Sequence, residues 1–266
     1  MKTNRSKSVI QSEPACRNGF TLLDLLVVLG VVAVLITLQL PVLASGKGQT
    51  KIGVCASHVR QLALACQIYA NDNSDHLPVL SGSAAWPWDL PVPVVDKLLK
   101  SGAATNTFYC PGTAPRFTDQ DNWLAPAPSS LWNFNSSGGA SGSRIVGYSL
   151  AFSGYGSFLH PTNQNSTMLP ETIMLGSTPL PAPAASERVL LADATISVGS
   201  SLPGYLSSYN NYTAITGGFA KQHLSPHLKG NIPAGGNLGF KDGHVAWRQF
   251  KLMTPRTTAA GPYFWW

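Results

Sequence analysis

The strongest pattern along the chain is a run of apolar residues near the N-terminus. Leu25 to Leu43 reads LLVVLGVVAVLITLQLPVL, in which Gln39 is the only strongly polar side chain, and Asp24 directly precedes it. A stretch of this length and apolarity can cross a bilayer as one helix, because a helix satisfies its own backbone groups in hydrocarbon. We therefore predict a transmembrane helix over residues 20–44.

Basic residues precede this run and set the expected orientation. Lys2, Arg5, Lys7 and Arg17 all lie N-terminal to it, which predicts a cytoplasmic N-terminus and a single-pass protein of the cytoplasmic (inner) membrane. The rest of the chain is then expected on the periplasmic side. A cleaved secretory signal is the poorer interpretation, because the apolar core of such a signal is shorter than the run from Leu25 to Leu43.

A second pattern predicts an amphipathic helix over residues 45–72 that continues the first one, with a kink at Pro41. Turn-forming residues from Asn71 to Asp75, followed by Pro78, are expected to end it. The apolar positions recur at intervals of three and four, which indicates one buried stripe: Ile52, Cys55, Val59, Leu62, Cys66 and Tyr69.

Residues 73–266 consist of short apolar pieces separated by Pro, Gly, Ser and Asn. This pattern predicts a β-rich head of short antiparallel strands with long loops, and an α+β fold overall. Gly147–Phe152 and Arg188–Asp193 are candidate strands. Three tryptophans in apolar patterns are expected to anchor the core: Trp86, Trp88 and Trp247.

The clearest strand signal is a hairpin near the C-terminus. Asn237–Phe240 and His244–Trp247 alternate in polarity and flank a turn containing Asp242 and Gly243. Asp-Gly between two alternating segments is typical of a tight β-hairpin, and we expect positive φ at Gly243.

Composition narrows the function classes. The chain has 266 residues, of which only 11% are charged, and 25 glycines and 20 prolines, so helix is not expected to dominate. The net charge is +6, but residues 1–19 hold four of the basic residues and one acidic residue. Without them 14 basic and 11 acidic residues remain, a charge of +3 that gives no reason to expect nucleic acid as a partner.

The segment Gly19-Phe20-Thr21-Leu22-Leu23-Asp24 resembles the class III signal of type IV pilins and type II secretion pseudopilins. The resemblance implies that a prepilin peptidase removes the leader 1–19 between Gly19 and Phe20, and that Phe20 is N-methylated. It implies an assembly role for Asp24, where the family usually has Glu, and for Pro41, where many pilins have a kinking proline. In that family the carboxylate pairs with the α-amine of residue 20, on the same or a neighbouring subunit. A hydrated, interfacial Asp24 is the alternative.

The C-terminal segment also carries a resemblance. Gly235 to Val245 is similar to the Asp-Gly motif that ends a pseudopilin-like family of environmental bacteria. That family has a His ten residues before the Asp, where this chain has Ile232, with His223 and His227 farther upstream. The difference leaves the turn intact and removes any role tied to that His.

The cysteines leave two alternatives open. Cys16 lies in the leader, and Cys55 and Cys66 are eleven residues apart on one helix face, too far to bond to each other. Either Cys110 forms a disulfide with one of these two, or all three are buried free thiols. No Cys/His metal spacing occurs. The residues from Asn71 to Asp75 fail the EF-hand pattern, and calcium in another geometry stays open.

No catalytic pattern is present, so we expect a protein that is not an enzyme and has no metal and no cofactor. His223 and His227 are expected in a surface loop because Pro226 lies between them. Asp193 and Asp242 fit strand-end and turn positions.

The sequence therefore predicts a pilin-like (pseudopilin) structural subunit, stored in the membrane and able to assemble into a type II secretion or type IV pilus-like filament. Its expected partners are the lipid bilayer, a prepilin peptidase, other pilin-like subunits and an assembly platform protein. The rival interpretation is a membrane-anchored envelope protein that does not polymerise and binds a glycan or a protein. An anchored hydrolase with a dispersed site is a further rival.

Overall fold

The computed structural model describes residues 19, 21–80, 86–118, 132, 142–154, 158–199, 210–216, 222–257 and 261–266, except for the side chains of 38–45. The chain divides into two compact units, Met1–Gly46 and Lys47–Trp266. The helices are α1 (Leu22–Asp72), α2 (Val92–Lys100) and the 3₁₀ helices η1 (Thr105–Phe108), η2 (Pro111–Thr113), η3 (Pro161–Asn163) and η5 (Phe250–Leu252).

In the first unit, α1 begins with a reciprocal capping arrangement. The Asp24 carboxylate accepts hydrogen bonds from the backbone N–H and the hydroxyl of Thr21, at 3.0 and 2.8 Å. The Asp24 N–H donates in return to the Thr21 hydroxyl oxygen at 3.2 Å. This pairing satisfies backbone donors that have no partner inside the first turn, which explains why the helix begins here.

The predicted transmembrane helix over residues 20–44 is wrong for the part of α1 that the structure describes. Among the described residues, no helix combines the length and the apolarity that a bilayer crossing requires. The same finding contradicts the predicted inner-membrane location with a periplasmic head.

In the second unit, α1 is amphipathic, as predicted. Cys55, Val59, Leu62 and Cys66 form a fully buried stripe, because residues three or four apart share one helix face. The helix ends at Asp72. The predicted turn follows, with Ser74 and Asp75 at positive φ.

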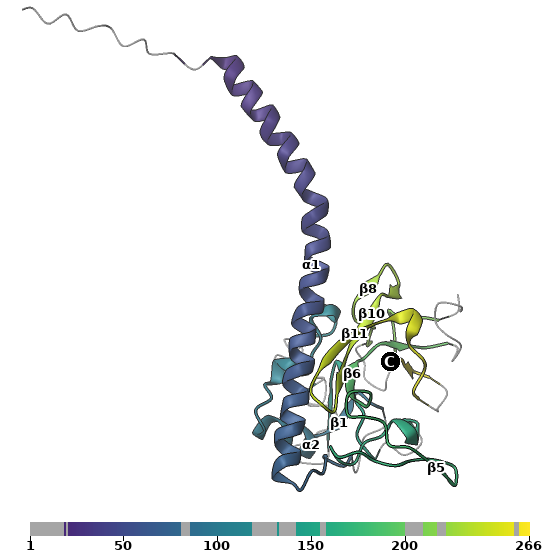
Figure 1. Ribbon diagram of the computed structural model, residues 1–266. Helices are drawn as coiled ribbons and strands as arrows, with labels where there is room; N and C mark the ends of the chain where they lie inside the picture. Colours follow the sequence, from purple (N-terminus) through teal and green to yellow (C-terminus); the bar gives the residue numbers. More distant parts are fainter. Residues whose placement is uncertain are drawn as a thin grey trace, which may run out of the picture. The chain divides into compact units, whose positions relative to one another are not determined.

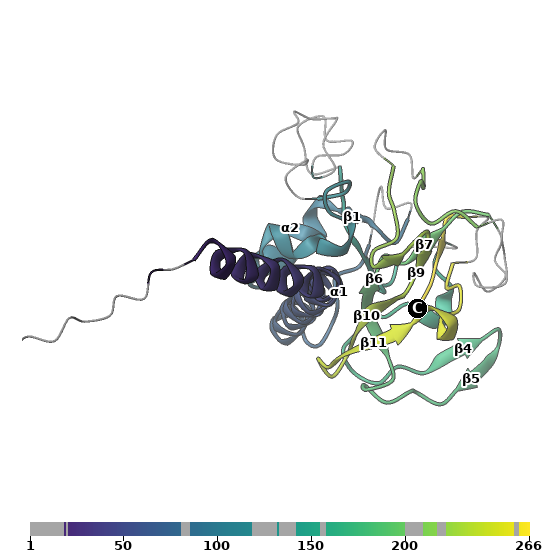
Figure 2. The same ribbon diagram turned by 90° about the horizontal axis from the view of Figure 1, so that it is seen from above.

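A four-stranded antiparallel sheet packs against this part of α1. Its order is β11–β10–β6–β3, and Figure 1 and Figure 2 show β6 and β10 beside the helix. A Cβ on Gly239 of β10 would lie 2.9 Å from Val59, so only glycine permits this close approach. The bounds are β3 (Tyr148–Leu150), β6 (Val189–Asp193), β10 (Gly235–Phe240) and β11 (Val245–Gln249).

Shorter strands pair in twos around this sheet, all of them antiparallel. The second unit therefore combines helix with a sizeable β component. The pairs are β1 (Asp89–Pro91) with β2 (Ser143–Ile145), β4 (Ile173–Leu175) with β5 (Thr178–Leu180), β7 (Ile196–Ser197) with β12 (Tyr263–Phe264), and β8 (Leu228–Lys229) with β9 (Ile232–Pro233).

The predicted C-terminal hairpin is confirmed. Strands β10 and β11 pair in register, with Leu238 opposite Ala246. Gly243 has φ +86°, the conformation expected for it. The Asp242 carboxylate accepts a hydrogen bond from the N–H of His244 at 3.1 Å, which fixes the turn locally.

The three tryptophans expected as core anchors have different surroundings. Trp88 is buried and stacks on His223, with ring centroids 4.7 Å apart, whereas Trp86 is half-buried. The prediction was wrong for Trp247, which is 36% exposed. Its strand, β11, is the edge of the four-stranded sheet and has a neighbouring strand on one side only.

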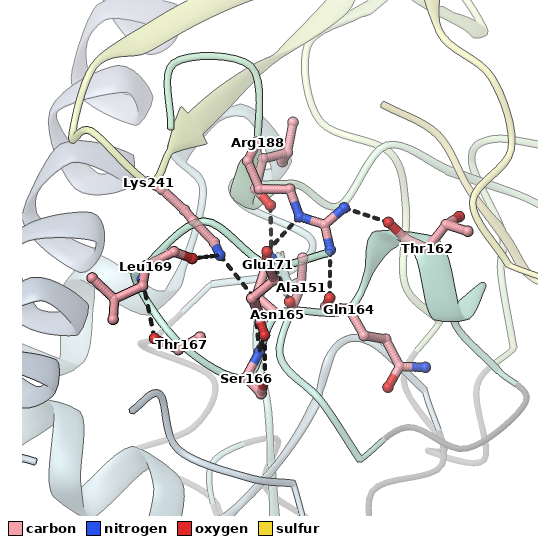
Figure 3. A network of polar contacts seen from close by, with 11 residues as sticks. Ala151, Thr162, Gln164, Asn165, Ser166, Thr167, Leu169, Glu171, Arg188 and Lys241 are labelled. Atoms are coloured by element: carbon pink, nitrogen blue, oxygen red, sulfur yellow. Dashed lines mark hydrogen bonds and ion pairs between the residues drawn. The ribbon is translucent and has the colours of Figure 1, made fainter. Parts of the chain in front are cut away.

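A network of polar contacts ties the loop after β3 to β6 (Figure 3). Arg188 is buried and donates from Nε to Asn165 Oδ1 at 2.6 Å, and also to the carbonyls of Thr162 and Gln164. Lys241 pairs with Glu171 at 2.8 Å. The guanidinium of Arg188 and the ammonium of Lys241 both have acceptors within the protein, so we interpret the network as structural.

Candidate functional site

The residues of the proposed processing site lie at the edge of what the structure describes. Gly19 is exposed, with nothing within 4 Å of an added Cβ, whereas Phe20 and the side chain of Pro41 lie outside the described residues. Asp24 is exposed, and hydrogen bonds from the backbone and hydroxyl of Thr21 lower the pKa of its carboxyl. Its observed role is to cap its own helix.

A second candidate site is a cluster of four buried side chains in the second unit, which we call the thiol cluster: Cys55, Cys110, Asp193 and His227. Each offers one atom able to bind a metal, and these atoms all lie within 4.8 Å of one another. Sequence spacing gave no sign of it.

Four different segments position these side chains. Cys55 lies on the buried stripe of α1, and Asp193 is the last residue of β6. Cys110 caps η2, where its sulfur accepts a hydrogen bond from the N–H of Gly112 at 3.3 Å. His227 directly precedes β8 and has φ +53°, unusual for a residue with a Cβ.

The contacts within the thiol cluster form a closed set. The Cys55 thiol donates to Asp193 Oδ1 at 2.8 Å, and the Cys110 thiol donates to the Cys55 sulfur at 3.2 Å. His227 Nε2 lies 3.3 Å from the Cys110 sulfur and 3.4 Å from Asp193 Oδ2. Cys55, Cys66 and Cys110 are all free thiols and buried, so the free-thiol alternative is confirmed and the disulfide was wrong.

Neighbouring groups complete the surroundings of the cluster. The Asn237 N–H donates to Asp193 Oδ2 at 2.6 Å. The Tyr148 hydroxyl lies 3.4 Å from the Cys55 sulfur, and either group can be the donor. Each of the carboxylate and the two sulfurs therefore has a contact from outside the four residues.

Burial and charge set the protonation of the cluster. Burial lowers the pKa of His227, but the hydrogen bond and charge of Asp193, together with Cys55, outweigh it and raise the pKa to about 9. Burial, chiefly, raises the pKa of Cys110 and of Tyr148 well above their ordinary values. At neutral pH the cluster therefore holds an imidazolium and a protonated Cys110 thiol.

Glycines border three of the four residues where no Cβ fits. A Cβ on Gly112 would lie 2.9 Å from the His227 ring, and one on Gly147 would lie 2.9 Å from the Cys110 nitrogen. A Cβ on Gly236 would approach the Asp193 Cβ to 3.0 Å. The backbone closes tightly around the cluster because these positions carry no side chain.

The arrangement is not that of a cysteine protease triad. In a triad the base meets the nucleophile with one ring nitrogen and the orienting carboxylate with the other. Here Cys110 and Asp193 both approach the same nitrogen, His227 Nε2. Two thiols, an imidazole and a carboxylate around one point are instead a donor set typical of a transition-metal site.

The two histidines expected in a surface loop are both buried, so that prediction was wrong. His223 stacks on Phe117, with ring centroids 3.8 Å apart, and burial lowers its pKa to about 4. It is a neutral core histidine. His227 joins the thiol cluster, whereas Ile232, at the position of the motif histidine, is half-exposed in β9.

Comparison with other proteins adds no relative: no protein-family model matches the chain, and neither a curated protein nor a solved structure shows significant similarity to it.

Proposed function

We propose that the chain is a pilin-like structural subunit that assembles by packing the first part of α1 against copies of the same chain. The observation that carries this proposal is the exposure of residues 22–37. Nearly all of them are apolar, yet none of their side chains is buried within the unit, with Leu22 84% and Leu26 70% exposed. Such a surface is unfavourable in water, so a partner is needed to cover it.

Copies of the same chain are the partner that best fits the exposed apolar surface of residues 22–37. The apolar side chains surround the helix on all sides, and a helix of this kind is buried among several neighbours. A single globular partner with one groove would cover one side only. Bundled α1 helices from several copies would cover every side. Such bundling is the arrangement expected of pilin-like filaments, whose subunits carry the signal that residues 19–24 resemble.

Asp24 has a second role in this proposal. When helices pack around it, its carboxylate leaves water, and a buried charge needs a partner beyond its own Thr21. Cleavage after Gly19 by a prepilin peptidase creates an α-amine at Phe20 that supplies the opposite charge from a neighbouring copy. The assembly platform protein is the further partner that this function requires.

Processing is tested by the intact mass of the protein expressed with a prepilin peptidase. We expect a mature chain that begins at Phe20 and carries one N-methyl group, and slower cleavage in Gly19→Ala. A chain that keeps Met1, or one cleaved near Ala44, contradicts the proposal.

Assembly is tested by sedimentation of the mature protein in mild detergent. We expect wild-type oligomers, and a shift towards monomer in Leu26→Ser combined with Leu29→Ser, which removes two apolar side chains without touching the second unit. The matched control is Leu252→Ser, an exposed leucine in the second unit. Assembly that survives the paired change contradicts the proposal.

A further inference from the structure

We propose that Cys55, Cys110, Asp193 and His227 bind one structural transition-metal ion of the zinc type. The site would be closed, with four ligands from the protein and none from solvent. This inference is independent of the proposed assembly, because all four residues lie within the Lys47–Trp266 unit.

The distances suit a tetrahedral ion after small shifts. With metal–sulfur bonds of about 2.3 Å and bonds to nitrogen or oxygen of about 2.0 Å, ligand atoms lie roughly 3.3–3.8 Å apart. The Cys110 sulfur lies 3.2 Å from the Cys55 sulfur and 3.3 Å from His227 Nε2, which in turn lies 3.4 Å from Asp193 Oδ2. Two contacts must open by several tenths of an ångström: that of Cys55 with Asp193, at 2.8 Å, and that between the two sulfurs. The widest pair of ligand atoms, which all lie within 4.8 Å of one another, must close.

His227 provides an independent observation. Its Nε2 faces the Cys110 sulfur at 3.3 Å and a carboxylate oxygen of Asp193 at 3.4 Å. The distance to the oxygen is longer than the usual 2.9–3.0 Å of an N–H···O bond. One N–H cannot point well at both acceptors, whereas one ion can be shared by all three atoms. The residue also adopts φ +53°, a region that residues with a Cβ rarely occupy, as happens where a side chain is held for a function.

Hydrogen-bond donors surround the four residues, as they do around the ligands of metal sites. Backbone N–H groups donate to the Cys110 sulfur from Gly112 and to Asp193 Oδ2 from Asn237. The Tyr148 hydroxyl lies within reach of the Cys55 sulfur. Donors of this kind orient anionic ligands and share their charge, and they are the groups that metal sites need around thiolates and carboxylates.

The donor set selects the ion. Thiolate and imidazole favour zinc and similar soft or borderline metals, whereas calcium and magnesium take oxygen ligands. Cysteine binds a metal as thiolate and histidine as neutral imidazole, so metal binding releases protons. The two thiolates, the carboxylate and the ion then carry a net charge of −1, which the three surrounding donors face.

The rival is a metal-free hydrogen-bond chain that runs from Cys110 through Cys55 to Asp193. To separate the two, the full chain is purified without oxygen and without chelator, and its bound zinc is measured. We expect one zinc per chain. Replacement by Co²⁺ should give the visible absorption of a tetrahedral ion together with a thiolate-to-cobalt charge-transfer band.

Single variants assign the ligands. Cys55→Ser, Cys110→Ser and His227→Gln should each weaken zinc binding by about 100-fold or more, measured in competition with a chelating dye. The matched control is Cys66→Ser, a buried thiol on the same face of α1 and outside the thiol cluster, which should keep one zinc per chain. Where a ligand variant does not fold, the cobalt spectrum of the wild type decides.

Several results overturn the proposal. One is a wild-type chain that takes up no zinc at micromolar concentrations. Others are a cobalt spectrum without the thiolate band, unchanged zinc binding in Cys55→Ser, and a disulfide between Cys55 and Cys110 in the freshly purified protein.

Discussion

Helix α1 contains two stretches that meet their surroundings in opposite ways. From Leu22 to Thr37 its side chains are apolar on every side, and all of them are exposed. From Lys47 to Asp72 most apolar side chains form one stripe, which is buried against the sheet. Both stretches are helical, so the pattern of side chains decides whether the apolar ones are buried within the same chain.

Two carboxylates repeat this contrast. Asp24 is exposed and is held by hydrogen bonds from Thr21, three residues away in the sequence. Asp193 is buried, and its contacts come from residues 34 to 138 positions away along the chain. The partner of Asp24 lies in the same turn of the same helix. The partners of Asp193 reach it only when the whole second unit has folded.

The largest expected effect comes from exchanging a leucine in each stretch. Leu62→Ala should lower the free energy of unfolding of the second unit by about 2–5 kcal/mol, because Leu62 is fully buried and its loss leaves a cavity. Leu26→Ala, on the exposed stretch, should change it by less than about 0.5 kcal/mol. Urea titration followed by tryptophan fluorescence measures both. Equal losses would erase the distinction between the two stretches.

A second prediction concerns the pair of Glu171 and Lys241. Glu171→Gln should destabilise the second unit by about 1–2 kcal/mol, because it leaves the buried ammonium of Lys241 without its counter-charge while Glu171 itself is partly exposed. Glu187→Gln, at an exposed position outside this pair, is the control and should have little effect.

The same pair gives a pH dependence. Burial raises the pKa of Glu171, but hydrogen bonds from Lys241 and Ser166 outweigh it, so the pKa lies below its ordinary value of 4.5. The stability from this group is therefore present above pH 4.5 and lost as the pH falls through the folded-state pKa. Acid unfolding should be shallower in Glu171→Gln than in the wild type, and identical slopes would contradict this.

Substitutions at two glycines, one in the hairpin turn and one in α1, should have opposite effects on stability. Gly243→Ala should cost roughly 1–2 kcal/mol, because Gly243 has φ +86° and an added Cβ would lie 2.9 Å from the Gln67 side chain. Gly53→Ala should instead stabilise α1 by about 0.5–1 kcal/mol, since Gly53 is helical, with open space around it. A melting midpoint that is unchanged or higher in Gly243→Ala would show that the turn does not require glycine.

The smallest effect is expected at the start of α1. Asp24→Asn should speed hydrogen exchange of the amides in the first turn, because the capping interaction with Thr21 weakens, and should leave the melting of the second unit unchanged. Asp24→Glu, which keeps the carboxylate, is the control. Unchanged exchange in Asp24→Asn would show that the cap does not hold the first turn.

Local patterns in the sequence correctly predicted the features that depend on residues close together in the chain. The buried stripe of α1 follows from residues three and four apart, the hairpin follows from Asp242 and Gly243, and β6 follows from a short apolar run. The fate of Trp247 depended on its strand lying at the edge of the sheet, which alternation along one strand cannot reveal. The apolar run near the N-terminus predicted a membrane span that no described helix provides.

The thiol cluster could not be predicted because no local pattern produces it. Its residues come from α1, the cap of η2, the end of β6 and the segment before β8, and the fold alone brings them together. Pro226 beside His227 argued for an exposed loop, but the chain there turns inward through positive φ. Buried free cysteines were a weak signal, since thiols are often buried without any further role.

The central claim is that the first stretch of α1 is covered by copies of the chain, and cysteine crosslinking tests it most directly. Single cysteines at positions 25 to 35 are introduced one at a time, and the protein is oxidised under native expression. The account predicts crosslinked dimers at several positions around the helix, fewer in Asp24→Ala and wild-type levels in Asp24→Glu. A cysteine at Lys229, an exposed residue at the end of β8, should give none. A chain that remains monomeric at every position from 25 to 35 would contradict it.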